Sequence, residues 1–472
     1  MEDEFKNEKL IEFNNYLKGR KVAVIGLGVS NIPLIDYLHD VKAEVTIFDG
    51  REIDDIDKAI VDKIVDFGMM FSFGNGYLDK LVGFDIIFRS PSCFPTVPQL
   101  EKEAQRGAII TSEVEMVIEL TPSLVIGVTG SDGKTTTTTL ISEILKEDGY
   151  NVFLGGNIGT PLFTKVKDMR PEDIVVLELS SFQLMNMKIS PKISVITNIT
   201  PNHLNVHKDM EEYVEAKKNI FKYQDENGLV ILNFDNEITN HAAEEANGKV
   251  VLFSSKNRIP NGYIVDDGKI KICKNDLRSH VFDTKNMKLR GMHNFENACC
   301  AIAATEGLVK KSSIDKVLTE FKGVEHRLEL VLETPDRVKW YNDSVSSSPT
   351  RTIAGLNAFP LKNIILIAGG YDKNLDYSPI GKPIVDNCKQ LILLGATSDK
   401  IEKAVKDELK KSNRELPIYR CSTLTETINK ANEIAVKGDI VLFSPASASF
   451  DMFKNFAERG NLFKQYVKEI VK

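Results

Sequence analysis

The stretch Thr129-Gly130-Ser131-Asp132-Gly133-Lys134-Thr135-Thr136 has the composition of a loop that holds a triphosphate. An apolar run at 124–126 precedes it and a helical pattern follows, which predicts a loop between a buried strand and a helix. Glycines let backbone N–H groups turn toward phosphate oxygens, Lys134 supplies a point charge, and the Thr135 hydroxyl can reach Mg²⁺. The positive end of the helix dipole adds to this. The stretch therefore predicts an ATP site, and the alternative is a tight turn without a ligand.

Composition indicates an ordinary folded protein of several domains. The chain has 472 residues, of which 42% are hydrophobic and 27% charged, and its formal net charge is -7. Such a balance lacks the basic field that binds nucleic acid, so no nucleic-acid partner is expected. Six cysteines without Cys-x-x-Cys spacing are expected to be core thiols. Because no stretch has the pattern of an export signal or a membrane span, we expect a cytoplasmic protein without membrane insertion.

The order of strand and helix patterns predicts an α/β protein of three domains. An apolar strand at 21–25 runs into a glycine turn and is followed by a strand at 43–49, which is a Rossmann-like opening. The strand at 124 and those at 174–178 and 193–197 indicate a central mononucleotide-binding parallel sheet. A third, Rossmann-like set has strands at 338–342, 363–370, 390–394 and 439–444. The predicted domains are 1–112, 113–324 and 325–472.

The first glycine turn departs from a dinucleotide fingerprint. Gly26 and Gly28 end the strand, but Asn31 stands where the third glycine would be, which makes a redox cofactor doubtful. A helix N-terminus for phosphate and Asp49 at the next strand end remain, so a nucleotide-linked substrate is expected. A purely structural turn is the alternative.

Polar residues follow the central strands. Glu178 ends a buried strand, where a carboxylate needs a cation, and Mg²⁺ is the natural partner. The turn at 180–183 offers hydroxyls and an amide to a polar substrate, with helix capping as the alternative. His203 follows the next strand and is a candidate second Mg²⁺ ligand, whereas His207 is expected on the polar side without a role. From composition alone, Lys217 reads as a solvated lysine.

The third domain also carries polar residues at strand ends. Asp343 follows one strand and is positioned to accept hydrogen bonds from a ribose. Lys373 and the backbone of Ser449 follow two others and are candidates to hold a small anionic molecule. Each of these segments alone is also compatible with a simple turn, and Lys373 with a solvated cation.

Together these motifs resemble the Mur ligases over nearly the whole chain. The resemblance implies ATP-driven amide formation in peptidoglycan synthesis: the alanine carboxylate of UDP-N-acetylmuramoyl-L-alanine becomes an acyl phosphate, which the amine of D-glutamate attacks. It also implies a cytoplasmic enzyme that uses Mg²⁺, and we expect a monomer. The motifs that carry the resemblance are residues 130–136, 155–159 and 178–183, His203, residues 293–297, His326-Arg327, residues 342–344 and the segment 444–460.

The resemblance also implies roles for individual residues. Lys217 falls on the family's carbamylated lysine, which reverses its reading as a solvated side chain. The implied sets are, for the UDP-linked substrate, Val29, Ser30, Asp49, Gly50, Arg51, Ser90, Asn157, Ser180 and Gln183; for ATP, Gly130, Ser131, Asp132, Gly133, Lys134, Thr135, Thr136, Asn297, Arg327 and Asp343; for D-glutamate, Lys373, Ser449, Phe450 and Phe456; for Mg²⁺, Thr135, Glu178, His203 and Lys217 as carbamate; and for catalysis, Lys134, Glu178, His203 and Lys217.

Three positions depart from the family pattern. Val345 stands where many relatives carry lysine, Asp132 replaces a common asparagine, and Asn205 replaces a frequent aspartate. Two other functions therefore stay open at this point. One is an amide ligase that extends a folate or a longer peptide, and the other is a nucleotide-binding regulator without catalysis.

Overall fold

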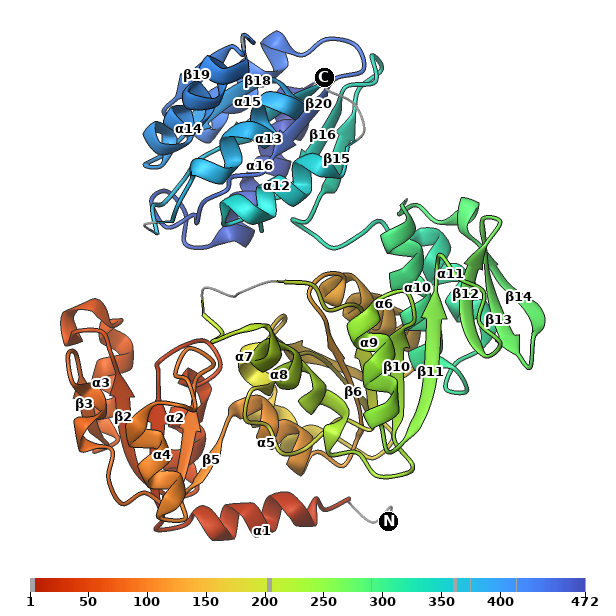
Figure 1. Cartoon of the computed structure of the whole chain (residues 1–472). Helices are drawn as coiled ribbons and strands as arrows, with labels where there is room; N and C mark the ends of the chain where they lie inside the picture. Colours follow the sequence, from red (N-terminus) through yellow and green to blue (C-terminus); the bar gives the residue numbers. More distant parts are fainter. Residues whose placement is uncertain are drawn as a thin grey trace. The chain divides into compact units, whose positions relative to one another are not determined.

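The structure is a computed structural model of the chain and describes residues 5–201, 206–289, 291–359, 363–373, 375–412 and 414–471. Two compact units emerge, Met1–Phe321 and Lys322–Lys472, and each is described by itself. Strands of the described residues form three sheets flanked by helices (Figure 1), so the α/β class is confirmed. The boundaries predicted at residues 112 and 324 stay predictions.

The first sheet is parallel throughout and has the order β3-β2-β1-β4-β5. The chain adds β2 and β3 on one side of β1 and then returns to add β4 and β5 on the other side. Ligands of such sheets bind at the carboxyl ends of the two strands flanking this switch, here β1 and β4. Its strands are β1 (Lys21–Ile25), β2 (Glu44–Asp49), β3 (Met70–Phe73), β4 (Ile86–Arg89) and β5 (Ile109–Thr111), and its helices are α1 (Glu8–Leu17), α2 (Ile32–Asp40), α3 (Lys58–Asp66) and α4 (Pro98–Gln105).

The second sheet, in the same unit, has the order β14-β13-β12-β11-β10-β9-β6-β8-β7. The strands predicted at 124, 174–178 and 193–197 pair parallel, as β6, β8 and β9, whereas β13, which sequence reasoning did not identify, pairs antiparallel with β12 and β14. Its strands are β6 (Leu124–Thr129), β7 (Val152–Gly156), β8 (Ile174–Glu178), β9 (Ile193–Ile196), β10 (Leu229–Asn233), β11 (Lys249–Ser254), β12 (Gly262–Asp266), β13 (Lys269–Lys274) and β14 (Leu277–Asp283). The accompanying helices are α5 (Glu113–Leu120), α6 (Lys134–Glu147), α7 (Ser181–Leu184), α8 (Met210–Lys222), α9 (Glu237–Ala242), α10 (Met292–Thr305) and α11 (Lys311–Glu320).

The third sheet forms the second unit and has the order β15-β16-β20-β17-β18-β19. It is parallel except for the edge strand β15, which sequence reasoning missed. Its elements are β15 (Glu329–Glu333), β16 (Lys339–Asn342), β17 (Ile364–Ala368), β18 (Cys388–Leu394), β19 (Ile418–Cys421) and β20 (Ile440–Phe443), with α12 (Pro349–Asn357), α13 (Gly381–Asn387), α14 (Ser398–Ser412), α15 (Leu424–Ile434) and α16 (Phe456–Ile470).

Period-two alternation explains why helices cover both faces of these sheets. In β17, Leu366 packs in one core cluster with α12, α13 and α14, whereas its neighbours Ile365 and Ile367 pack in another with α15 and α16. Both sets are fully buried, so the strand reads as one continuous apolar run. Among the described residues, no helix combines the length and apolar character needed to cross a membrane.

Asn31 has a structural role that replaces the third glycine of the dinucleotide pattern. Its side chain is 1% exposed, and its Nδ2 donates to the carbonyl oxygens of Ile25 and Gly26, both at 3.0 Å. These bonds hold the start of α2 against the end of β1. The turn is therefore closed by a side chain and not by the close backbone approach that glycine permits.

Asn31→Ala should loosen this turn. Losing these two hydrogen bonds, of which the one to Ile25 is buried and the one to Gly26 partly buried, costs about 1–3 kcal/mol in local stability. Hydrogen exchange of the amides in β1 and β2 measures the effect and should accelerate. The matched control Asn15→Ala, at an exposed position of α1, should leave these rates unchanged. Equal protection in both variants would contradict the assigned role.

Candidate active site

The loop between β6 and α6 needs its glycines. Gly130 has φ +147°, and a Cβ added there would lie 1.9 Å from Thr197 Oγ1. Gly133 has φ +80°, and its Cβ would lie 2.4 Å from Asn297 Oδ1. Both conformations are unfavourable for side chains. Asn297, a predicted ATP residue, therefore lies directly against the loop at Gly133. Thr197, the residue after strand β9, lies against the loop at Gly130.

A cavity of about 290 Å³ opens beside this loop. Among its lining residues are the predicted ATP residues Asp132, Gly133 and Asn297, and also Phe253 and His293, for which the sequence indicated no individual role. The departing residue Asp132 is exposed. Since the cavity adjoins the glycine loop, it lies where the rest of a loop-bound nucleotide would extend.

Two lysines converge on one carbonyl oxygen of the loop. Lys134 Nζ donates to the carbonyls of Gly130 at 2.8 Å and Ser131 at 2.9 Å. Lys217 Nζ, from α8, also donates to the Gly130 carbonyl at 2.8 Å. Two cationic amines that share an acceptor repel each other unless one is neutral or an anion lies nearby.

Lys217 is buried, so its reading as a solvated lysine is wrong, while its neighbour Lys218 makes the surface ion pairs with Glu215 and Glu245. Burial, followed by the charge of Lys134, lowers the pKa of Lys217 well below its ordinary value. Its amine lies 4.8 Å from the Tyr213 ring centre. The folded chain therefore favours a neutral amine here, which is the form that reacts with CO₂.

Glu178 at the end of β8 has one oxygen suited to a cation. The residue is 2% exposed and pairs in register with Val128 of β6, next to the loop. Its Oε1 accepts from Asn157 Nδ2 at 2.8 Å, whereas Oε2 is buried and has no hydrogen-bond partner among the described residues. A buried carboxylate oxygen without a donor fits Mg²⁺.

The remaining predicted metal ligands are only partly described. Thr135 is buried at the start of α6, and Lys217 lies at the same loop. His203 falls outside the described residues, as does the departing Asn205. Within the part of the chain that is described, no three His, Cys, Asp or Glu side chains gather as a metal cluster.

The turn after Glu178 combines capping with an unexpected histidine contact. Ser180 and Gln183 form a capping box at α7, as the structural alternative predicts. Ser181 Oγ lies 2.9 Å from His207 Nε2, and the His207 ring stacks on Phe182 at 5.1 Å. His207 is buried, so its placement on the polar side is wrong. No local pattern marks it, because its partner Ser181 lies 26 residues away.

Six of the nine predicted UDP-substrate residues lie at the carboxyl ends of β1, β2 and β4 in the first sheet, namely Val29, Ser30, Asp49, Gly50, Arg51 and Ser90. Asp49 accepts from the Leu27 amide at 2.7 Å and from Arg51. Burial acts to raise the pKa of Asp49, but the bonds from Arg51 and the Leu27 amide outweigh it, so the pKa is lowered. Ser90, at the end of β4, packs so closely on Gly26 that a Cβ there would lie 2.6 Å from Ser90 Oγ. Of the other predicted residues, Ser30 is half-buried, and Val29, Gly50 and Arg51 are exposed.

In the second unit, Asp343 is engaged by protein donors. It is 3% exposed and accepts from Ser346 Oγ at 2.6 Å, Ser444 Oγ at 2.7 Å and the Leu328 amide at 3.2 Å. Burial raises the pKa of Asp343 despite these bonds. Arg327, the other predicted ATP residue of this unit, is half-buried. The ribose contact stays a prediction.

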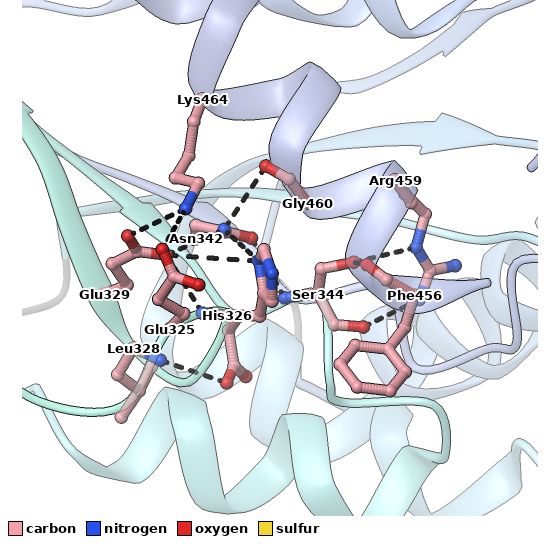
Figure 2. Close-up of polar contacts among 11 residues, drawn as sticks. Glu325, His326, Leu328, Glu329, Asn342, Ser344, Phe456, Arg459, Gly460 and Lys464 are labelled. Carbon is pink, nitrogen blue, oxygen red and sulfur yellow. Dashed lines mark hydrogen bonds and ion pairs between the residues drawn. The ribbon is translucent and has the colours of Figure 1, made fainter. Parts of the chain in front are cut away.

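Figure 2 shows the contacts between residues 325–329 and helix α16. His326 has φ +63°, its amide donates to Glu329 at 2.9 Å, and its Nδ1 lies 2.9 Å from Asn342 Nδ2. A Cβ on Gly460 would lie 2.3 Å from His326 Nδ1, so glycine admits the imidazole against the helix. Lys464 adds ion pairs to Glu325 and Glu329.

Arg459, also drawn in Figure 2, ties the loops of this unit together and was not predicted. It is 2% exposed and donates to Ser344 and to the carbonyls of Ser447 and Ala448. Burial lowers the pKa of Arg459 to about 10. Ser344 Oγ in turn donates to the Phe456 carbonyl at 2.8 Å.

The predicted D-glutamate residues lie beside these loops. Ser449 is buried, whereas Phe450 is 59% and Phe456 44% exposed. Lys373 is exposed, with its amine 5.6 Å from the Phe450 ring centre, and Tyr371 meets the same ring edge-on at 5.8 Å. A cation beside an exposed aromatic ring can receive a small carboxylate.

A glycine phosphate loop with a buried lysine and carboxylate, on parallel-rich sheets, defines an ATP-using α/β enzyme. A family model described as Mur ligase middle domain matches residues 128–305, and one described as Mur ligase, glutamate ligase domain, matches residues 326–447. The chain belongs to the Mur ligase family.

Curated relatives are similar over almost the whole chain. The UDP-N-acetylmuramoylalanine--D-glutamate ligase of Acetivibrio thermocellus is 48% identical over 466 residues, covering 98% of this chain and 99% of its own. That of Ruminiclostridium cellulolyticum is 47% identical over 466 residues, covering 98% and 100%. The crystal structure of UDP-N-acetylmuramate-alanine ligase MurC from Thermotoga maritima has a TM-score of 0.56 at 17% identity, covering 95% of this chain and 99% of that one. This last likeness shows the fold alone.

Gly130→Ala should abolish the geometry of the phosphate loop. The added methyl group would collide with Thr197 and strain a backbone that needs positive φ, so ATP affinity should fall at least about tenfold. Calorimetric titration with ATP and Mg²⁺ measures it. Gly149→Ala, at the far end of α6, is the matched control, since it has φ +102° but nothing within 4 Å of its Cβ. Wild-type affinity in Gly130→Ala would refute the loop assignment.

Proposed function

We propose that this chain is an ATP-dependent ligase that joins D-glutamate to UDP-N-acetylmuramoyl-L-alanine in peptidoglycan precursor synthesis. The observation that carries the proposal is the convergence of Lys134, Lys217 and the partnerless Glu178 oxygen at the glycine loop of a Mur ligase. The names of relatives that match almost the whole chain support this pair of substrates. They also disfavour a folate ligase and a regulator without catalysis.

The chemistry follows from the poor reactivity of a carboxylate. The alanine carboxylate oxygen attacks the γ-phosphorus of ATP, the bond to the β-phosphate oxygen breaks, and ADP leaves. The D-glutamate nitrogen then attacks the acyl carbon, loses a proton, and inorganic phosphate departs with the bonding electrons. Lys134 offsets negative charge on the phosphoryl group. Mg²⁺, held by Thr135, Glu178, His203 and the Lys217 carbamate, would supply further charge neutralisation.

Lys217 is proposed to act as a carbamate. Its neutral amine attacks the carbon of CO₂, a proton is released, and a carboxylate-like group results. Its burial and its lowered pKa support this role, since a protonated amine has no lone pair for the attack. The change from a neutral amine to an anion would also place a negative charge near the ammonium of Lys134, which donates to the same Gly130 carbonyl.

The remaining roles are proposals of the same kind. The UDP-linked substrate binds at the β1–β4 switch point and reaches Asn157, Ser180 and Gln183. The roles proposed for ATP fall on the loop, Asn297, Arg327 and Asp343, and the cavity beside Asn297 would receive a part of the nucleotide that extends beyond the loop. D-Glutamate is received by Lys373, Ser449, Phe450 and Phe456. We further propose domains 1–112, 113–324 and 325–472, a cytoplasmic location and a monomer.

Phosphate release tests the activity. With ATP and Mg²⁺, the chain should release phosphate only when UDP-N-acetylmuramoyl-L-alanine and D-glutamate are both present, because the acyl phosphate needs one and its capture the other. Omission of either substrate is the control. Release that depends on a folate or on a longer UDP-linked peptide would favour the other ligase class, and nucleotide binding without turnover would favour the regulator.

Lys217→Ala should lose at least about a hundredfold in kcat, because one metal-organising anion disappears. Short carboxylic acids such as acetate should partly restore turnover by filling the place of the carbamate. Steady-state rates with and without added acid measure this. Lys218→Ala is the matched control, since its amine pairs with Glu215 and Glu245 on the other side of the helix from the Lys217 contact with Gly130. If Lys217→Ala turns over like the wild type, the lysine has no part in the reaction.

A further inference from the structure

Arg89, the last residue of β4, is a buried arginine to which no role is assigned above. It is 1% exposed, and all its side-chain nitrogens donate. Nε donates to Asn186 Oδ1 at 2.8 Å, and one terminal nitrogen donates to the carbonyls of Cys93 at 3.2 Å and Ser90 at 3.4 Å. The other donates to the Phe182 carbonyl at 3.0 Å and also to Asn186. The fork of the guanidinium is therefore fully used.

These acceptors come from two different sheets. Ser90 and Cys93 follow β4 of the first sheet, whereas Phe182 and Asn186 belong to the turn that follows β8 of the second. The Phe94 ring also meets Phe182 edge-on at 6.1 Å, so an apolar contact accompanies the polar one. Both contacts lie inside the unit Met1–Phe321.

Both ends of this bridge reach the predicted UDP-substrate site. Ser90 itself is one predicted contact, and Phe182 lies between two others, Ser180 and Gln183. The substrate is long, with a nucleotide at one end and a reacting carboxylate at the other. It can place that carboxylate beside Glu178 only if the two sheet ends keep a fixed spacing.

The cost of burying Arg89 argues that this spacing matters. Burial lowers its pKa, and its hydrogen-bond acceptors are all uncharged amides and carbonyls. The carboxylate of Glu115 contributes an attraction but no direct bond. An apolar residue would fill such a place at lower desolvation cost, but it would not fix the distance and angle between the two loops.

We propose that Arg89 is a positioning residue for the UDP-linked substrate: its planar fork holds the Ser90 loop and the Phe182 turn at the spacing that substrate requires. This inference rests on the proposed function, because it takes UDP-N-acetylmuramoyl-L-alanine as the ligand. The spacing of the two loops depends on the planar geometry of the guanidinium and not on its charge alone.

Titration calorimetry of the full chain with UDP-N-acetylmuramoyl-L-alanine, and separately with ATP and Mg²⁺, tests the proposal. Arg89→Met should raise the Kd for the UDP-linked substrate about tenfold or more and leave the Kd for ATP within about twofold. Unchanged ATP affinity shows that the variant is folded around the phosphate loop. A merely structural role would instead lower both affinities together or neither.

Two conservative variants separate geometry from charge. Arg89→Lys keeps the charge, but an ammonium cannot serve both loops, so it should weaken substrate binding nearly as much as Arg89→Met. Asn186→Asp keeps the acceptor and cancels the charge, so it should bind substrate within about threefold of the wild type. Wild-type affinity in Arg89→Lys together with weakened binding in Asn186→Asp would overturn the proposal in favour of charge.

Both affinities are also measured for a control variant and for the wild type. Arg20→Gln, whose side chain is half-exposed in a surface pair with Asp85, should leave both affinities unchanged. Arg89→Met that binds the UDP-linked substrate as tightly as the wild type would also overturn the proposal. Failure of the wild type itself to bind this substrate would instead remove the proposed function, so the two failures are distinguishable.

Discussion

The carbonyl oxygen of Gly130 is the point on which the central site depends. Lys134 from α6 and Lys217 from α8 both donate to it, so one backbone atom fixes the distance between the phosphate lysine and the buried lysine. That atom holds its place because Gly130 adopts a conformation that only glycine tolerates and lies against Thr197. Gly130 thereby holds the end of β6 against the residue that follows β9, with both lysines bonded to its carbonyl oxygen.

This arrangement has an electrostatic consequence. Two lysines share one acceptor, one of them is almost fully buried, and the adjoining Glu178 has a buried oxygen without a donor. Like charges at this spacing raise the free energy of the folded state. The lowered pKa of Lys217 favours its neutral form, which removes this repulsion. The proposed negatively charged adduct of Lys217 would also remove this repulsion, and the proposed metal ion would instead compensate the buried Glu178 oxygen that lacks a donor.

Local sequence was sufficient for the parts of this site that follow one another along the chain. The glycine loop, the strand-end Glu178 and the parallel strands are encoded by short patterns of apolar runs, glycines and polar ends. Burial of Lys217 was not readable locally, because Lys218 beside it is equally basic and only helix orientation separates them. The roles of His207, Arg89 and Arg459 were missed for a related reason: each has a partner far along the chain, 26 residues away for His207, 97 for Arg89 and 115 for Arg459. The antiparallel strands β13 and β14 do have a local signal, which sequence reasoning overlooked: the two-residue loops Asp267-Gly268 and Asn275-Asp276 have positive φ at both residues, as in type I′ hairpin turns.

In the second unit, contacts between distant segments fix the positions of predicted ligand residues. Its predicted ATP residues, Arg327 and Asp343, and its predicted D-glutamate residue Phe456 come from opposite ends of the unit's sequence. His326 packs on Gly460 and bonds to Asn342, and Ser344 bonds to the carbonyl of Phe456. All these contacts are internal to Lys322–Lys472. The distance between Phe456 and the two predicted ATP residues is therefore fixed within this unit. It would stay the same if the unit moved as a rigid body.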